Sequence, residues 1–393
     1  MENRENYISV FSSVETRRNT LRVLFLEPQP CIRALKYAIA LKREMGKDVS
    51  LWLGYVGHSL SELYGFGEEY FDKISRLNPE RLGKSVRKII SECKPQVIHS
   101  HNAPDVLTLE AIDASDCTPV IHDIHEVLSL HNSGFFEGDN GEKMARYQKE
   151  EKRACEESDG RIYATEGIRE YIQEQYSVDA QSSIVFYNYA SGSVMPRHFK
   201  RELSAEDGET HIVYIGCVTS VVEGSHYDLR EIFQRISDCN IHIHIYPTRD
   251  NITRSNETYR KLADHNRFIH YHCHLGYERL LHEITQYDFG WAGYNYGLNG
   301  QHLDIAIQNK IFDYISSGLP IIAFPYTTLQ RFLERHDVGL IIESINDLPW
   351  LLKETDVSSL KNSALNARNL LTFEHNIPKL LDFYMKMIGA SNA

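Results

Sequence analysis

Long apolar runs and paired cysteines are both missing from this sequence, and each absence excludes a class of protein. No segment of the 393 residues approaches the roughly eighteen consecutive apolar residues of a membrane-spanning helix. The seven cysteines are scattered and contain no C-x-x-C pair, so neither a zinc ribbon nor a redox disulfide is expected. The first twenty residues are polar and mixed in charge, unlike a signal peptide. We therefore expect a cytoplasmic protein in a reducing compartment.

Basic charge is also scarce. Lys and Arg total 42 against 54 Asp and Glu, which gives a formal net charge of −12. An acidic surface repels the phosphates of DNA and RNA, so no nucleic-acid partner is expected. A single nucleotide remains compatible with this charge, because a few local donors can hold one pyrophosphate.

Short apolar runs alternate with helical patterns in two successive halves of the chain. In the first half the runs are LRVLFL (21–26), VSLWLGY (49–55), QVIHSH (96–101), PVIHDIH (119–125), RIYAT (161–165) and SIVFYNY (183–189). In the second half they are HIVYIG (211–216), IHIHIYP (241–247), FIHYHCH (268–274), DFGWAGY (288–294) and PIIAF (320–324). Such runs suit strands that are buried on both faces. The alternation predicts two Rossmann-like α/β domains, each built on a doubly wound parallel sheet.

The composition also predicts where the domains begin and end. We expect a flexible tail, a first domain, a polar linker, a second domain and an amphipathic C-terminal helix that can cross back to the first domain. Their ranges are 1–20, 21–192, 193–209, 210–372 and 373–393. Open α/β sheets bind ligands beyond the carboxyl ends of their strands, so the site is expected in the cleft between the two domains.

The stretch QNKIFDYISSGLPIIAF, residues 308–324, carries the most functional information. Helical spacing places Lys310 and Asp313 on neighbouring turns. The stretch resembles the nucleotide-sugar motif of GT-B fold glycosyltransferases, particularly family 4 of the retaining enzymes. The resemblance implies that Asp313 accepts hydrogen bonds from the donor ribose, for which a carboxylate has two oxygens, and that Lys310 lies near the pyrophosphate. A plain amphipathic helix is the alternative.

Two strands of the first half add to this resemblance. KPQVIHSHNAPD (94–105) and PVIHDIHEV (119–127) are similar to family strands that end in H-x-H and in T-V-H-D. The resemblance implies that His122 lies in the cleft near the reacting sugar, and we predict His122 and Asp123 as catalytic residues. The alternative is that both residues only end a strand and cap a helix.

Four residues of the first domain are candidates for the acceptor side of the cleft. His101 shares a strand face with His99 and is the one nearer the strand end. Arg33 can meet an anionic acceptor or lie on a solvated helix face. Asn102 can contact substrate or cap the helix that begins near Pro104. Glu166 can contact an acceptor or cap the helix that it opens.

The opening strand of the second half, HIVYIG, resembles the Y-I-G strand of the family. Gly216 is therefore expected to let the backbone approach the donor phosphates. The Arg and Lys that follow this glycine in the family are missing from GCVTSVVEGSHYDLR, residues 216–230. His226, Arg230 or backbone amides are the candidates to replace them.

The E-x7-E pattern of the family is incomplete as well, because Asp304 stands one position away from where its first acidic residue is expected. The chain carries YNYGLNGQHLD, residues 294–304, which we interpret as a loop above the donor sugar. Its expected donor contacts are Asn299, Gly300 and Gln301.

No metal cofactor is expected, although the chain has 19 histidines. His270, His272 and His274 alternate on one strand face, but three ligands in line on one strand converge poorly on one ion. The GT-B enzymes of the resemblance generally use no divalent ion for their chemistry.

The sequence thus predicts a retaining glycosyltransferase that moves a sugar from a UDP- or GDP-sugar to an acceptor hydroxyl. A glycan, a glycolipid and a small molecule are all open as acceptors, as are peripheral contact with the inner membrane surface and the oligomeric state. Two alternatives stand beside this prediction. One is a hydrolysing sugar-nucleotide epimerase of the same fold, and the other is a catalytically silent homologue that serves as a partner subunit.

Overall fold

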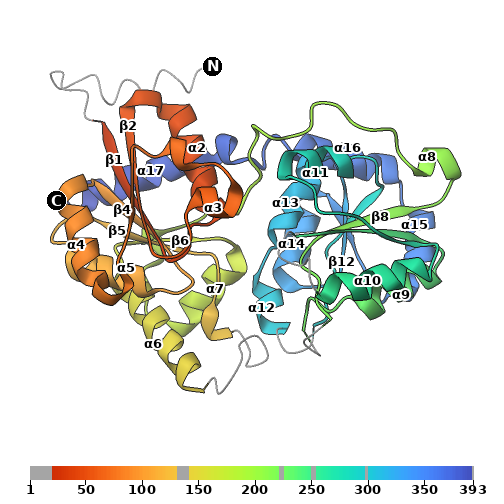
Figure 1. Ribbon diagram of the computed structural model, residues 1–393, viewed down its shortest axis with the longest axis horizontal. Helices are drawn as coiled ribbons and strands as arrows, with labels where there is room; N and C mark the ends of the chain where they lie inside the picture. The colour runs from red at the N-terminus through yellow and green to blue at the C-terminus, as the bar shows by residue number, and fades with distance from the viewer. Residues whose placement is uncertain (1–19, 131–140, 221–224, 249–253, 297–299, 392–393) are drawn as a thin grey trace.

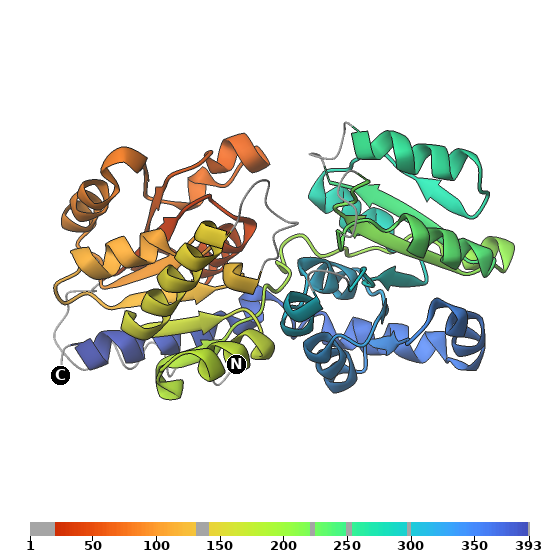
Figure 2. The same ribbon diagram turned by 90° about the horizontal axis from the view of Figure 1, so that it is seen from below.

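The computed structural model describes residues 20–130, 141–220, 225–248, 254–296 and 300–391. These residues form two α/β lobes that lie side by side (Figure 1), and the view from below shows the same division (Figure 2). Each lobe is built on one parallel sheet, of seven strands in the first and six in the second. The predicted pair of doubly wound sheets is therefore confirmed.

The first sheet has the strand order β3-β2-β1-β4-β5-β6-β7, and all of its neighbours are parallel. Its central strands are buried, as their mostly apolar sequences predict, and β4 and β5 also carry buried polar residues. The edge strand β3 was not predicted, because its sequence KISR is polar and half exposed. The strands are β1 (Leu21–Glu27), β2 (Val49–Tyr55), β3 (Lys73–Arg76), β4 (Val97–His101), β5 (Val120–Ile124), β6 (Gly160–Tyr163) and β7 (Ser183–Val185).

Helices cover both faces of this sheet. One face packs against α4 (Leu82–Cys93) and α5 (Val106–Ala114) through a separate apolar cluster. The other face lies under α2 (Ile32–Met45) and α17 (Phe373–Ser391), which contact each other. The remaining helices of this lobe are α3 (Leu60–Tyr64), α6 (Gly141–Glu157) and α7 (Glu166–Gln175). Helix α17, dark blue in Figure 1, thus belongs to the first lobe although it ends the described chain.

The second sheet has the order β10-β9-β8-β11-β12-β13, again parallel throughout. Its strands are β8 (His211–Gly216), β9 (His242–Pro247), β10 (Ile269–Tyr271), β11 (Phe289–Trp291), β12 (Ile321–Ala323) and β13 (Gly339–Ile341). Its helices are α8 (Ser204–Asp207), α9 (Arg230–Asp238), α10 (Arg254–Asp264), α11 (Tyr277–Ile284), α12 (Gly300–Ile305), α13 (Asn309–Ser316), α14 (Thr327–His336), α15 (Leu348–Glu354) and α16 (Val357–Ala367). Among the described helices, none combines the length and the apolar composition of a membrane span.

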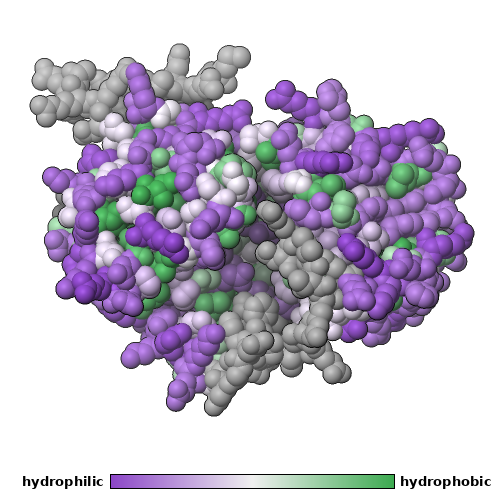
Figure 3. Space-filling view, viewed as in Figure 1, coloured by the Kyte–Doolittle hydropathy of each residue, from purple (hydrophilic) through white to green (hydrophobic). Residues whose placement is uncertain are grey.

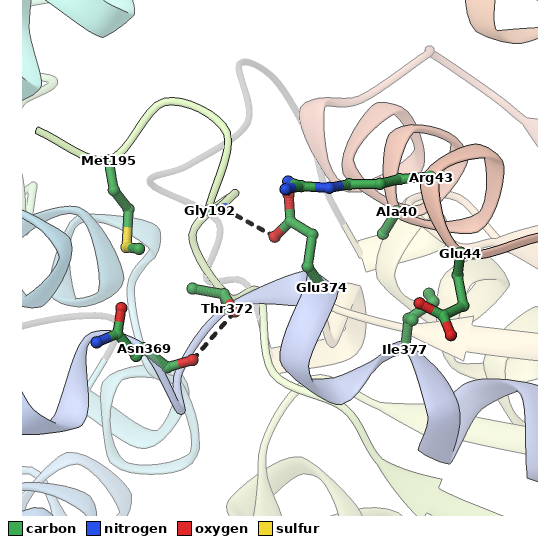
Figure 4. Close-up of a pocket in the computed structure, with 9 residues that line it drawn as sticks. All are labelled: Ala40, Arg43, Glu44, Gly192, Met195, Asn369, Thr372, Glu374 and Ile377. Atoms are coloured by element: carbon green, nitrogen blue, oxygen red, sulfur yellow. Dashed lines mark hydrogen bonds and ion pairs between the residues drawn. The ribbon is translucent and has the colours of Figure 1, made fainter. Parts of the chain in front are cut away.

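The chain crosses between the lobes twice, and the two crossings touch. Ala190 on the outward path forms a parallel bridge with Thr372 on the return path. Glu374, at the start of α17, accepts a hydrogen bond from the backbone nitrogen of Gly192 at 2.7 Å and lies 3.7 Å from the Arg43 guanidinium. Figure 4 shows these contacts around a cavity of about 350 Å³ between α2, the outward path and the start of α17. The two crossings therefore tie the lobes together at one point.

Candidate functional site

The two lobes meet where the strands of both sheets end. After β6, the Thr165 hydroxyl donates a 2.6 Å hydrogen bond to the carbonyl of Ile305 in the second lobe. After β5, Glu126 lies 3.5 Å from His302 of α12. The surface is hollowed between the lobes (Figure 3). A cleft at the carboxyl ends of both sheets is where open α/β sheets bind ligands.

Lys310 lies in the first turn of α13, on the wall that the second lobe presents to this cleft. Its side chain is 8% exposed, and its Nζ lies 3.6 Å from the centroid of the Tyr214 ring and 4.9 Å from that of Tyr294. Within the described part of the chain, Nζ has no hydrogen-bond partner. Burial holds the pKa of Lys310 well below its usual range, opposed by the charges of Cys217 and Asp313. The two ring faces stabilise the ammonium in part, yet its hydrogen-bonding capacity is unused.

Gly216 ends β8 directly beside this ammonium. Its φ of 132° is a conformation that favours glycine. A Cβ at this position would lie 3.0 Å from Lys310 Nζ. The absence of a side chain at Gly216 therefore leaves space next to the Lys310 amine.

Asp313 lies one turn further along α13. Its Oδ1 accepts a 2.6 Å hydrogen bond from the Tyr277 hydroxyl. Burial raises the pKa of Asp313, and the Lys36 charge, the Tyr277 hydrogen bond and the Lys310 charge oppose that rise. Lys36 comes from α2 in the first lobe, where its Nζ donates to the carbonyl of Tyr189 at 2.8 Å. The residue of the first lobe that acts on Asp313 is therefore Lys36.

His122 occupies a different place from the one predicted. Its side chain is fully buried on the face of β5 that packs against α5. Nε2 lies 3.1 Å from Asp105 Oδ1, and Nδ1 lies 2.9 Å from the Thr108 hydroxyl. The structure therefore does not bring His122 together with Asp313 across the cleft.

Asp123 points to the opposite face of β5, as alternation along a strand requires. Its carboxylate accepts from Arg33 Nε at 3.0 Å and from His99 Nε2 at 3.0 Å. Burial raises the pKa of Asp123, but Arg33, His101 and His99 more than offset it, so that pKa lies well below its usual range. Asp123 is thus the anionic centre of a buried network beneath the cleft.

Arg33 belongs to the same network, so its alternative placement on a solvated helix face was wrong. It is 1% exposed and also donates to the carbonyl of Phe186 at 2.7 Å. Helix α2 carries Arg33 and Lys36, and it packs between the sheet and α17, so both side chains are buried. The spacing of two charged residues one turn apart does not reveal this burial.

His101 lies at the end of β4, as predicted. Its ring stacks on His99 with centroids 4.7 Å apart, and its Nε2 lies 3.2 Å from Glu27 Oε1 at the end of β1. Cys31 Sγ is 3.8 Å from its Nδ1. Burial raises the pKa of Glu27 well above its usual range. Glu27 and Cys31 were not predicted, because a carboxylate after an apolar strand carries no distinctive pattern.

His125 was not predicted from the sequence as a site residue. It follows the last residue of β5, and its ring lies 5.8 Å from that of His101. No described residue forms a hydrogen bond with its Nδ1. The repeat of histidine at 122 and 125 offers two candidates, and only the point at which β5 ends, Ile124, shows that the second is the one at the strand end.

Asn102 holds the backbone at His125, and the helix-capping alternative for this residue is wrong. Its Oδ1 accepts from the His125 nitrogen at 3.1 Å and from the Glu126 nitrogen at 3.4 Å. Its amide donates to the Glu126 carbonyl. Helix α5 begins only at Val106, with Asp105 at the cap position. Asn102 thus fixes the segment that carries His125.

Glu166 spans the interface between the lobes. Its Oε1 lies 2.9 Å from Arg335 Nη1 of α14, and the Tyr187 hydroxyl donates to it at 2.6 Å. The N-cap of α7 is Thr165, whose hydroxyl accepts from the Ile168 nitrogen at 3.0 Å. Thr165 therefore has the capping role expected for Glu166, and Glu166 forms an ion pair between the lobes.

The expected loop at 294–304 contains a short helix. Gly300 and Gln301 open α12, with Gly300 buried against the Tyr296 ring and Gln301 exposed. Asn299 lies outside the described residues. Of the two proposed replacements for the family's basic pair, Arg230 is held 2.5 Å from Asp228, and the His226 ring packs 3.9 Å from that of Tyr227. Among the described residues, Lys310 is a basic side chain that lies directly beside Gly216.

Comparisons with known proteins agree with this geometry. Residues 55–189 match the family model Glycosyltransferase Family 4, and residues 233–374 match the model Glucosyltransferase 3-like, C-terminal domain. A comparison with curated proteins found no match.

Solved structures share the fold at low identity. A glycosyltransferase from Rickettsia africae is 11% identical with a TM-score of 0.68, covering 94% of this chain and 99% of its own. Anabaena HepE in complex with UDP-glucose is 12% identical with a TM-score of 0.62 and the same coverage. A UDP-N-acetylglucosamine 2-epimerase is 12% identical with a TM-score of 0.56, covering 94% of this chain and 95% of its own. With one model matched in each lobe and the fold shared throughout, the chain is a family 4-like glycosyltransferase of the GT-B fold.

Proposed function

We propose that this chain transfers a sugar from a nucleotide-sugar to an acceptor hydroxyl, with the donor pyrophosphate held between Gly216 and Lys310. The observation that carries the proposal is the Lys310 amine, which among the described residues is buried without a hydrogen-bond acceptor, next to a glycine that leaves room for a ligand. Charging a buried amine that has no partner costs several kcal/mol. An anionic ligand relieves that cost, and a pyrophosphate supplies both the charge and the acceptor oxygens.

The position of Asp313 supports a nucleoside next to that pyrophosphate. It lies one turn from Lys310 on the same helix, and its Oδ1 accepts a hydrogen bond from the Tyr277 hydroxyl. A carboxylate in this place can accept from the ribose hydroxyls. The UDP-glucose bound by Anabaena HepE favours a uridine nucleotide, and we propose a UDP-sugar as the donor.

The chemistry that we propose proceeds with retention at the anomeric carbon. The bond from that carbon to the leaving phosphate oxygen breaks, the acceptor oxygen bonds to the same face, and the acceptor proton passes to the leaving phosphate. Lys310 stabilises the negative charge that develops on the pyrophosphate. We propose that no divalent ion acts in the cleft, so adding Mg²⁺ or Mn²⁺ to chelator-treated protein leaves turnover unchanged.

The acceptor side lies on the first lobe. Glu27, His101 and His125 gather at the ends of three neighbouring strands. Glu27 and His101 are buried and pair with each other, so His125, which is partly exposed, is the member of this group that can meet a hydroxyl-bearing acceptor. We propose His125 as the group nearest the reacting sugar in place of His122, because it stands at the strand end and Asn102 fixes its backbone. The acceptor is therefore a glycan, a glycolipid or a small polyhydroxyl molecule.

Calorimetric titration with UDP-glucose and with GDP-mannose tests the donor site. We expect the UDP-sugar to bind, and Lys310→Met to weaken its binding at least about tenfold, since a charged hydrogen bond contributes about 1.5–3 kcal/mol. Lys353→Met, an exposed lysine on α15, is the matched control. Unchanged affinity in Lys310→Met would contradict the proposal.

Because an epimerase is among the similar structures, sugar-nucleotide epimerisation has to be distinguished from sugar transfer. Incubation with the UDP-sugar alone and analysis of the sugar by mass and chromatography distinguishes the two enzymes. A released epimer formed without any acceptor favours the epimerase. Failure to bind either nucleotide-sugar favours a silent partner subunit.

A further inference from the structure

A second cluster of polar side chains lies on the other end of the second sheet, away from the cleft. His211 is the first residue of β8 and His242 the first of β9, and the two are direct neighbours in the parallel register. Their rings stack with centroids 4.4 Å apart and planes within 6°. Since residues in register on parallel strands share a face, both imidazoles project from the same side of the sheet at its amino edge.

Two carboxylates meet these rings at their Nε2 atoms. Asp207 ends α8, and Gly208, with φ 78°, turns the chain so that Asp207 and Glu209 both face the histidines. Asp207 Oδ2 lies 3.0 Å from His211 Nε2, and Glu209 Oε2 contacts His242 Nε2. The ligand atoms of Asp207, His211 and His242 all lie within 4.8 Å of one another. The carboxylates are half exposed and the imidazoles are buried, so the cluster is reachable from solvent.

The other nitrogen of each ring is already held. His211 Nδ1 lies 3.0 Å from His244 Nε2, and His242 Nδ1 lies 2.8 Å from His270 Nε2. Metal-binding histidines usually have their second nitrogen fixed by a hydrogen-bond partner, which sets the ring orientation and leaves one nitrogen for the ion. In both histidines here the nitrogen that remains for an ion is Nε2, on the side of the carboxylates.

His270, His272 and His274, the three histidines that the sequence places on one strand face, do not belong to the proposed ligand set. His270 and His272 each bond to a histidine of β9, the second at 3.0 Å from His244 Nδ1, and His274 Nδ1 lies 3.4 Å from the Pro247 carbonyl. The three histidines therefore have three different partners and do not converge on one point. His211 and His242 differ from these three histidines because they come from two neighbouring strands. They can therefore converge on one ion together with the carboxylates of the preceding turn.

We propose that Asp207, His211 and His242 bind a divalent metal ion of the zinc class, with Glu209 as a fourth ligand. Two neutral imidazoles and two carboxylates suit a tetrahedral site of this kind and balance its charge. The ion would join the turn through which the chain enters the second lobe to two strands of its sheet. It lies at the amino ends of the strands, whereas the donor cleft lies at their carboxyl ends, so its role is structural and it takes no part in sugar transfer.

Titration of the chelator-treated full chain with ZnCl₂ tests this site. We expect one equivalent to bind and to raise the thermal unfolding midpoint. Asp207→Asn, a change at an exposed position, and His211→Gln should each weaken binding more than about tenfold. His265→Gln, an exposed histidine on the same lobe, is the matched control and should bind as the unaltered chain does. If His211→Gln fails to fold, Asp207→Asn alone decides the result.

Cobalt(II) identifies the ligands and separates this site from other clusters. Glu27, Cys31 and His101 form another group whose ligand atoms lie close together, in the first lobe. Cobalt at the proposed site has no sulfur ligand and gives ligand-field absorption without a thiolate charge-transfer band, and Cys31→Ser leaves binding unchanged. A thiolate band, loss of binding in Cys31→Ser, absence of zinc binding, or zinc affinity that survives Asp207→Asn would overturn the proposal.

Discussion

Among single residues, the protonation of Lys310 decides how strongly the proposed donor site attracts a pyrophosphate. Burial lowers its pKa, and a bound pyrophosphate favours the charged form and so raises that pKa again. We therefore predict that binding a UDP-sugar is accompanied by proton uptake at a pH that lies between the lowered pKa of the free protein and the raised pKa of the complex. Calorimetry in two buffers of different ionisation enthalpy measures it, and a UDP-sugar is the suitable ligand because its own diphosphate does not titrate in that range.

The Lys310→Met variant is the control for this proton uptake, since it removes the titrating group. Its binding enthalpy should not depend on the buffer. A buffer-independent enthalpy in the unaltered chain would mean that Lys310 does not change protonation on binding.

Asp313 leads to a prediction about the ribose. The unaltered chain should bind UDP more tightly than 2′-deoxy-UDP by about tenfold or more, because a hydrogen bond to a carboxylate contributes about 1.5–3 kcal/mol. Asp313→Asn should lose most of this discrimination, since an amide has only one acceptor oxygen. Competition binding with the two nucleotides measures the ratio, and an equal preference in both proteins would remove Asp313 from the ribose site.

At the scale of elements, β5 separates two histidines with different roles. We predict that His122→Ala destabilises the first lobe by about 3 kcal/mol, because Asp105 and Thr108 lose a buried partner. His125→Ala, at the strand end, should cost little stability and lower the rate of sugar transfer. Urea denaturation and turnover of the two variants measure both effects, and the reverse pattern would contradict the assignment.

The same strand shows what the sequence allows one to predict. Mostly apolar runs identified β1, β5 and β8, because a strand buried on both faces is rich in apolar residues. β5 also carries the buried polar residues His122 and Asp123. Short polar elements, such as β3 and α12, have no such signal and were missed. For the site, α13 with Lys310 and Asp313 was predicted because one helix sets their spacing, whereas the choice between His122 and His125 depends on where β5 ends, which alternation alone does not fix.

The partners of Arg33 and Glu166 were beyond prediction for another reason. Arg33 bonds to Asp123, 90 positions away, and Glu166 pairs with Arg335, 169 positions away. Contacts of this kind follow from the packing of whole helices and domains, and no local pattern in the sequence records them.

At the scale of the whole molecule, ion pairs hold the lobes together beside the cleft. Arg335 pairs with Glu166 at 2.9 Å, and Arg331 pairs with Glu170 at 3.0 Å. Burial raises the pKa of Glu166, but hydrogen bonds from Tyr187 and Arg335 more than offset it and leave that pKa below its usual value. A group with a depressed pKa stabilises the folded arrangement at neutral pH, and this stabilisation is lost as the pH falls through the lowered pKa.

We therefore predict that Glu166→Gln loosens the contact between the lobes at pH 7. Small-angle X-ray scattering should show a larger radius of gyration than for the unaltered chain, and the difference should shrink as the pH falls and Glu166 takes up a proton. Glu157→Gln, whose partner Arg153 lies on the same helix, is the control and should leave the radius unchanged. A radius that does not respond to Glu166→Gln would show that this ion pair does not hold the lobes together.

A crystal structure of the chain with a bound UDP-sugar would test the proposed donor site between Gly216 and Lys310. We expect a diphosphate oxygen within about 3 Å of Lys310 Nζ, next to Gly216, and hydrogen bonds from the ribose hydroxyls to Asp313. A nucleotide bound elsewhere, or a diphosphate that leaves the Lys310 ammonium without a partner, would contradict it.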